Sequence, residues 1–141
     1  MNMKRYLDIS LAYAVAAMAG GVFYREFTKW NGFTGVTALG KVHVHLFLLG
    51  MVMFLLVALF ADRLDLSGNG RFHAFMCIYN VGVPLTACML IVRGVTQVLA
   101  TPLSPGVDSA ISGIAGIGHI LVGVGLVLLL LSLRQAARKA V

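Results

Sequence analysis

Four long apolar runs, separated by short polar stretches, set the pattern of this chain. A helix needs about 20 apolar residues to cross roughly 30 Å of hydrocarbon. The stretches between the runs carry Gly, Pro, Asn and Asp, which supply turns and helix caps. The pattern predicts four membrane-spanning segments at approximately Tyr6–Tyr24, Leu39–Ala61, Phe75–Ala100 and Ser109–Leu133.

Each span is expected to be a helix, because backbone groups must be paired within the lipid. The connections are short and favour antiparallel neighbours. The sequence therefore predicts an all-α integral membrane protein, an antiparallel four-helix transmembrane bundle that occupies residues 1–141 as one domain. The first run follows Lys4 and Arg5 and ends in AAMAGG, as a secretory signal would, and we expect it to stay as the first span.

Composition agrees with a membrane protein. Hydrophobic residues make up 60% of the chain and charged residues 11%, whereas about a quarter of a soluble domain is charged. The net charge of +6 comes from Lys and Arg that flank the runs, so lipid headgroups are expected partners and nucleic acid is not. Seven basic residues lie in the termini and the middle loop: Lys4, Arg5, Arg63, Arg71, Arg134, Arg138 and Lys139. Only three lie near the other ends of the spans: Arg25, Lys29 and Lys41. This predicts a multi-pass protein of the bacterial inner membrane with both termini cytoplasmic.

Three histidines and an arginine lie inside the apolar runs. His43 and His45 begin the second run, in KVHVHLFLLGMVM, and His119 lies in the fourth, in SGIAGIGHILVGVG. With the predicted orientation, these residues and Arg93 of the third run share the outer half of the membrane. An ionisable residue at that depth marks a functional site by default.

Small residues surround two of these histidines. His119 shares a helix face with Gly116 and Gly123, and His43 shares one with Gly50. A strip without side-chain bulk permits either close helix contact or a flat macrocycle whose iron an imidazole can reach. We expect His43 and His119 to ligate one haem b. Because His43 and His45 lie about 200° apart around a helix, both can address one ligand only if the helix begins irregularly.

The second run also resembles a known helix. KVHVHLFLLGMVM resembles the haem-bearing second helix of the haem-copper oxidase and nitric oxide reductase subunit I superfamily, although Met51 stands where Trp is usual. The resemblance implies that His43 is an axial haem ligand. The multi-histidine copper site of those oxidases is not in the sequence. With GVFYREFTKWNGFTG, YNVGVPLT and SGIAGIGH, the chain further resembles a bacterial family of small four-span membrane proteins of unknown function.

Other residues have two expected roles each. The Arg93 guanidinium is expected to pair with a haem propionate, or with Glu26 or backbone carbonyls. Arg25, after the first span, either contacts a propionate or anchors the chain at the interface. His45 either binds a propionate, a second metal or a quinol, or has an inert interfacial role. His73 lies in a loop and is not expected to be a ligand.

These residues favour a membrane b-type haem protein for electron transfer or for redox or gas sensing, with oxidoreductase activity open and no catalytic residue assigned. A membrane quinol or an outer-face redox protein is the expected partner, and glycine contacts permit a homo-oligomer. The first alternative is a copper or zinc site formed by His43, His45 and His119. The second is a scaffold whose histidines only join helices. Hydrolysis is unsupported, because the sequence has no phosphate loop, nucleophile elbow or carboxylate pair.

Overall fold

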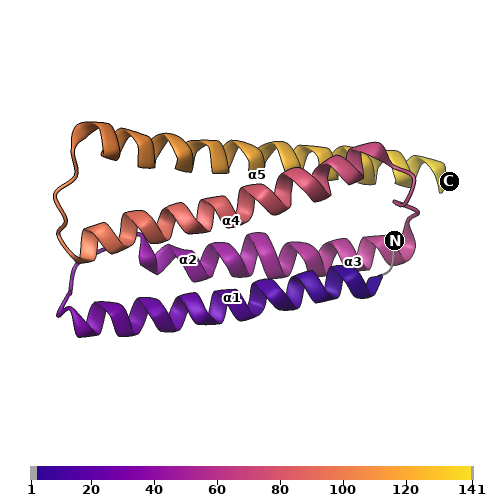
Figure 1. Ribbon diagram of the computed structural model, residues 1–141. Coiled ribbons are helices and arrows are strands. Elements are labelled where there is room, and N and C mark those ends of the chain that lie inside the picture. The colour runs from indigo at the N-terminus through magenta and orange to yellow at the C-terminus, as the bar shows by residue number, and fades with distance from the viewer. Residues whose placement is uncertain (1–2, 141) are drawn as a thin grey trace.

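The computed structural model describes residues 3–140, and this part of the chain is helical with no strand. Figure 1 shows long helices that run back and forth, so that the start of α1 and the end of α5 lie at the same end of the molecule. The helices are α1 (Met3–Trp30), α2 (Leu39–His45), the π-helical segment η1 (Leu46–Val52), α3 (Met53–Arg63), α4 (Gly70–Val98) and α5 (Pro105–Lys139).

Four helical stretches are long and apolar enough to cross a membrane. They are Met3–Trp30, Leu39–Arg63, Gly70–Val98 and Pro105–Lys139, and the second comprises α2, η1 and α3. The prediction of a multi-pass membrane protein with four spans is confirmed at this level. The helices extend past the predicted spans into the polar stretches, because hydropathy marks where lipid contact ends and not where the helix ends.

Local caps explain the observed helix ends. The Asn69 side chain accepts hydrogen bonds from the backbone N–H groups of Arg71 and Phe72, which begins α4 five residues before the predicted span. The hydroxyl of Ser104 accepts from the N–H of Val107, and Pro105 follows it at the first helical position of α5.

The second span changes its helical winding in the middle. Residues of η1 form a π-helix. In this winding, some backbone carbonyl groups lose the hydrogen bond that an α-helix would give them. The Tyr79 hydroxyl donates to the carbonyl oxygen of Leu49 at 2.8 Å, and the Ser10 hydroxyl donates to that of Met51, also at 2.8 Å. Side chains from α4 and α1 therefore stabilise the irregular winding from both sides.

An aromatic core joins α1, α3 and α4. Phe54 is fully buried and stacks on Tyr13 with ring centroids 5.7 Å apart. It also contacts the rings of Phe75 and Tyr79, each at 6.1 Å. Tyr6 and Phe72 extend this cluster toward the end where the chain starts. The aromatic rings of the core thus come from the first three spans.

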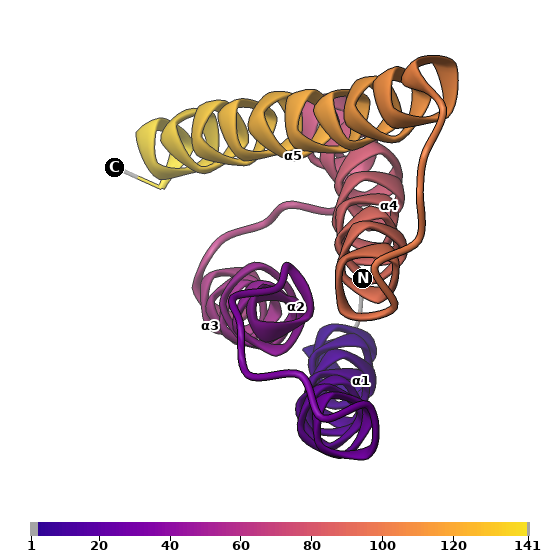
Figure 2. The same cartoon turned by 90° about the vertical axis from the view of Figure 1, so that its left-hand side faces the viewer.

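The fourth span contributes aliphatic side chains to the core, Val122, Leu129 and Ala136, but no aromatic ring. α5 packs along α4 and makes little contact with α1, α2, η1 or α3. Figure 2 shows α5 crossing α4 and leaning away from the other helices, so the spans do not form a closed bundle. The crossing is close because Gly118 of α5 lies against Thr86 of α4, where an added Cβ would come within 2.7 Å of the threonine hydroxyl.

Candidate cofactor site

His45 and His119 lie next to each other, although they come from different spans. Their ring centroids are 6.3 Å apart and their planes meet at 85°. His45 is the last residue of α2, and His119 lies in the first half of α5. His119 is exposed and His45 is half-buried, so other side chains do not enclose the pair. The pair is therefore accessible from the surface of the molecule.

Both rings are held in the same way. Nδ1 of His45 lies 2.9 Å from the carbonyl oxygen of Lys41, and Nδ1 of His119 lies 2.8 Å from that of Ala115. A carbonyl only accepts, so each Nδ1 must carry the hydrogen. Nε2 of each ring is then the unprotonated nitrogen, and neither Nε2 has a hydrogen-bond partner among residues 3–140. Backbone bonds of this kind fix the tautomer of metal-ligating histidines.

His43 faces in a different direction from the one we expected. Its ring stacks on Tyr24 of α1, with centroids 6.5 Å apart and planes 15° from parallel. A Cβ added at Gly21 of α1 would lie 3.7 Å from Cβ and Cγ of His43. Because residues two apart in a helix differ by about 200°, turning His43 toward α1 leaves His45 to face α5. The structure thus favours His45 over His43 as the residue opposite His119.

The Nδ1 atom of His43 is buried and has no hydrogen-bond partner among the described residues. A buried polar atom without a partner costs about 1–3 kcal/mol. Tyr24 covers this ring from α1, and no ion pair or hydrogen bond joins the two side chains. His43 is therefore packed into the interface between α1 and α2, where it has no access to the space beside His119.

The glycines that we expected at the site separate into two groups. Gly116 and Gly123, one turn on either side of His119, are exposed, and a Cβ on either would meet nothing within 4 Å. Gly50 is instead buried against Tyr13, where an added Cβ would lie 2.3 Å from the ring. The strip on α5 is open, whereas Gly50 permits close packing of α1 on the second span.

The arginines also find partners in the protein. Arg93 forms an ion pair with Asp108, in the first turn of α5, and its Nη2 donates to the Ser112 hydroxyl at 2.8 Å. This pairing replaces the expected contact with Glu26, whose carboxylate lies 3.9 Å from Arg25. The Arg25 side chain is 80% exposed. Arg93 therefore joins α4 to α5 about two turns from His119, and Arg25 remains at the surface.

The three intramembrane histidines do not converge. Within residues 3–140, no group of three or more His, Cys, Asp or Glu side chains could hold a metal ion together. His73 lies outside this region, and its Nε2 contacts the carbonyl oxygen of Ser67 at 2.8 Å. The arrangement offers two neighbouring imidazoles beside the open glycine positions of α5, and not a compact three-nitrogen site.

Sequence reasoning missed two features of the site. The first is the role of the Lys41 and Ala115 carbonyls, which orient the rings; each stands four residues before its histidine, a spacing that the sequence does show. The second is Asp108 in the first turn of α5, one residue before the predicted span, whose pairing with Arg93 the sequence did not predict.

Comparison with known proteins leaves the activity of the chain open. No curated protein and no solved structure matches it. One family profile does match, and it covers residues 3–136, nearly the whole chain. The resemblance to a family of small membrane proteins of unknown function is thereby confirmed. The chain belongs to the family described as Protein of unknown function (DUF2871).

Proposed function

We propose that this protein is a membrane b-type haem protein that holds the haem iron between His45 and His119 and transfers electrons. The observation that carries the proposal is the His45–His119 pair, with both Nδ1 atoms bonded to carbonyls and both Nε2 atoms free of protein partners. Neutral imidazole with a bare nitrogen is the ligand form that haem iron takes from histidine.

The separation of the rings fits one iron between them. A metal–imidazole bond is about 2 Å long and a ring centre lies about 1 Å behind its nitrogen, so two axial imidazoles have centroids about 6 Å apart. The observed separation is 6.3 Å. Perpendicular ring planes are compatible with axial ligation, because each ring bonds through its own lone pair. The spacing therefore supports a metal ion shared by His45 and His119 better than a direct contact between the two rings.

Open backbone beside His119 supports a macrocycle in particular. Gly116 and Gly123 present no side chain, and nothing lies within 4 Å of a Cβ at either position. A porphyrin that lies against α5 needs such a strip above and below its ligand. Since α5 packs mainly on α4 and makes little contact with the first two spans, this face of α5 is left largely uncovered. The haem would fill the space between the second and fourth spans.

The ligand set also limits the chemistry. Haem would supply one-electron exchange, and if His45 and His119 both held its iron, no position would be left for oxygen or nitric oxide to bind. The protein sets the potential through the apolar surroundings and the carbonyl bonds to Nδ1. A membrane quinol or an outer-face redox protein is the proposed partner. The resemblance of the second span to the haem-bearing helix of haem-copper oxidases stays a prediction.

The proposed orientation follows the basic residues. Lys and Arg concentrate at the end of the molecule where α1 starts and α5 finishes, and by the positive-inside rule this supports a cytoplasmic position for this end in a bacterial cell. His45 and His119 then lie in the outer half of the inner membrane. Electron exchange with a partner at the outer face is favoured by this placement.

An absorption spectrum of the purified protein, made with ample haem supply, tests the proposal. We expect a Soret band, sharp bands in the reduced state and bound iron. His45→Ala and His119→Ala should each lose most of the bound haem, whereas His43→Ala and His73→Ala should keep it. Loss with His43→Ala but not with His45→Ala would restore the pair first predicted from the sequence.

Two other results would reject the proposal. Bound copper or zinc without a Soret band would indicate a metal site without haem. A colourless protein without bound metal would indicate a scaffold. Circular dichroism of each variant distinguishes loss of the ligand from loss of the fold, because unfolding would lower the helical signal as well.

A further inference from the structure

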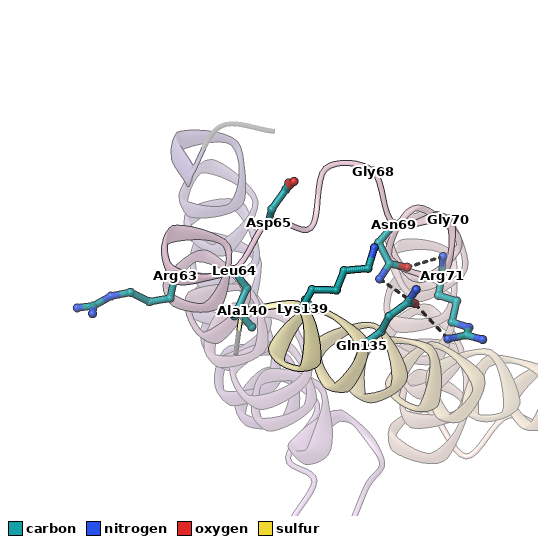
Figure 3. Close-up of a pocket in the computed structure, with 11 residues that line it drawn as sticks. Arg63, Leu64, Asp65, Gly68, Asn69, Gly70, Arg71, Gln135, Lys139 and Ala140 are labelled. Carbon is teal, nitrogen blue, oxygen red and sulfur yellow. Dashed lines mark hydrogen bonds between the residues drawn. The ribbon is translucent and has the colours of Figure 1, made fainter.

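A polar hollow lies at the end of the molecule opposite the histidines. Its volume is about 560 Å³, and it lies among the end of α3 with its following loop, the start of α4 and the end of α5. Figure 3 shows the side chains that line it. These three segments end where the membrane spans end, so the hollow lies at the level of the lipid headgroups.

Two cations that line the hollow, Arg71 and Lys139, form no ion pair within residues 3–140. Arg71 makes no ion pair; its Nη1 donates to Oε1 of the neutral Gln135 at 3.2 Å. The same oxygen accepts from Nδ2 of Asn69 at 3.3 Å, so a fixed amide network orients the guanidinium. Lys139 extends across the hollow toward the loop that holds Asn69. The positive charge of both side chains is therefore available to a ligand.

The balance of charge around the hollow is positive. Arg134 and Arg138 line an adjoining hollow together with Arg71 and Lys139. Asp65 is the acidic residue on the wall, and it accepts hydrogen bonds from the amide and hydroxyl of Ser67 at 3.0 and 2.6 Å. Its carboxylate is thus hydrogen-bonded within its own loop, and it also interacts electrostatically with Lys139 without forming an ion pair with it.

The backbone around the hollow is accessible too. A Cβ at Gly68 or Gly70 would meet nothing within 4 Å, so a ligand can approach the main chain there. Gly70 begins α4, and the first turn of a helix attracts negative charge. Arginine binds phosphate through its planar fork, and lysine adds a mobile point charge. Positive side chains, open backbone and the helix start all favour a phosphate group.

We propose that this hollow binds the phosphate-bearing headgroup of an anionic phospholipid, with Arg71 and Lys139 as its main ligands. The acyl chains would lie along the apolar surface of α4 and α5. This site is separate from the histidine pair, and it does not depend on the proposed haem. The lipid would anchor the end of α5, which otherwise packs mainly on α4.

Native mass spectrometry of the full chain tests the proposal. Protein released from nanodiscs of equal phosphatidylglycerol and phosphatidylcholine should retain phosphatidylglycerol. The variant with Arg71→Gln and Lys139→Gln should bind this lipid roughly tenfold or more weakly, because each lost charged hydrogen bond changes a binding constant by about that factor. The variant with Arg25→Gln and Lys29→Gln removes the same charge from the other end and should retain the lipid.

Several outcomes would overturn the proposal. Equal loss in both double variants would show a general effect of net charge. Equal retention of phosphatidylcholine would show no preference for an anion. Glycerol phosphate in solution serves as a third arm, and displacement of the lipid by it at equal concentration would assign the site to soluble phosphate. Lys139→Gln alone lies at an exposed helix end, so its weaker lipid binding can be measured even if the Arg71 variant unfolds.

Discussion

The Tyr79 hydroxyl donates a hydrogen bond to the carbonyl oxygen of Leu49 at 2.8 Å, within the π-helical segment that directly follows His45. Tyr79 is fully buried in the aromatic core of α4. A side chain fixed by the core thus pairs with a carbonyl of the irregular winding. This bond connects the backbone that follows His45 to the buried core.

Tyr79→Phe should therefore destabilise the protein by about 1–3 kcal/mol, because it leaves a buried carbonyl without its partner and changes no ring contact. Thermal unfolding in a membrane mimetic measures the loss. Tyr24→Phe is the control, since the Tyr24 hydroxyl makes no hydrogen bond in the described part of the chain. Equal stability of the two variants would show that the bond to Leu49 contributes nothing.

Gly50→Ala should destabilise the protein more severely. The added Cβ would lie 2.3 Å from Cγ of Tyr13, and that ring is itself stacked on Phe54. Overpacking a filled core costs about 1–3 kcal/mol or more. Gly113→Ala on α5 is a matched control, because nothing lies within 4 Å of its Cβ. Similar unfolding temperatures for both variants would contradict the close contact.

Hydropathy predicted the four spans well because each exceeds the length that a bilayer requires. It could not predict how they pack. In lipid, apolar side chains gain little by facing another helix, so small residues and hydrogen bonds decide the contacts. Gly118 against Thr86 fixes α5 on α4, and nothing equivalent closes α5 onto α2 or α3. The helices are therefore arranged openly, with α5 leaning away from the first two spans.

The choice between His43 and His45 shows a second limit. Gly50 shares the face of His43 and suggested room for a macrocycle, and Gly40 lies on the same helix face. In the structure they accommodate Tyr24 and Tyr13 of α1, so the missing side chains serve helix contact. A glycine beside a histidine indicates that something lies close, but the sequence does not say whether it is a neighbouring ring or a cofactor.

Asp65 gives a prediction on pH, because it lies in the loop between α3 and α4. Hydrogen bonds from the Ser67 side chain and amide lower the pKa of Asp65 below its usual value. A lowered pKa in the folded state adds stability above the unfolded pKa of about 4, and this contribution is lost as the pH falls through the folded pKa.

Ser67→Ala should accordingly raise the pKa of Asp65 toward its ordinary value. The carboxyl ¹³C shift of Asp65, followed against pH in a detergent sample, measures the change. Ser109→Ala is the comparison variant and should leave the titration unchanged. A Ser67→Ala curve that overlays the parent would mean that the hydroxyl does not stabilise the carboxylate.

Arg93 and Asp108 give a test of how α5 is attached. The Arg93 side chain is 26% exposed and that of Asp108 is 53% exposed, so screening by solvent should limit their coupling to about 1 kcal/mol. A double-mutant cycle with Arg93→Gln and Asp108→Asn measures this energy in thermal unfolding. If Arg93 serves only this junction, both single variants should retain haem equally. Loss of haem with Arg93→Gln alone would instead assign the guanidinium to a propionate.

Substitutions at Gly116 and Gly123 can distinguish an effect on haem binding from an effect on the stability of the fold. Nothing lies within 4 Å of a Cβ at either position, and alanine favours a helix over glycine by about 1 kcal/mol, so Gly116→Ala should fold at least as well as the parent. Gly116→Leu and Gly123→Leu should fold but bind much less haem, because the side chain would occupy the strip beside His119. Ile114→Leu, at an exposed position on the same helix, should bind haem normally. Full haem content in both leucine variants, measured by the ratio of Soret to protein absorbance, would mean that no macrocycle lies against α5.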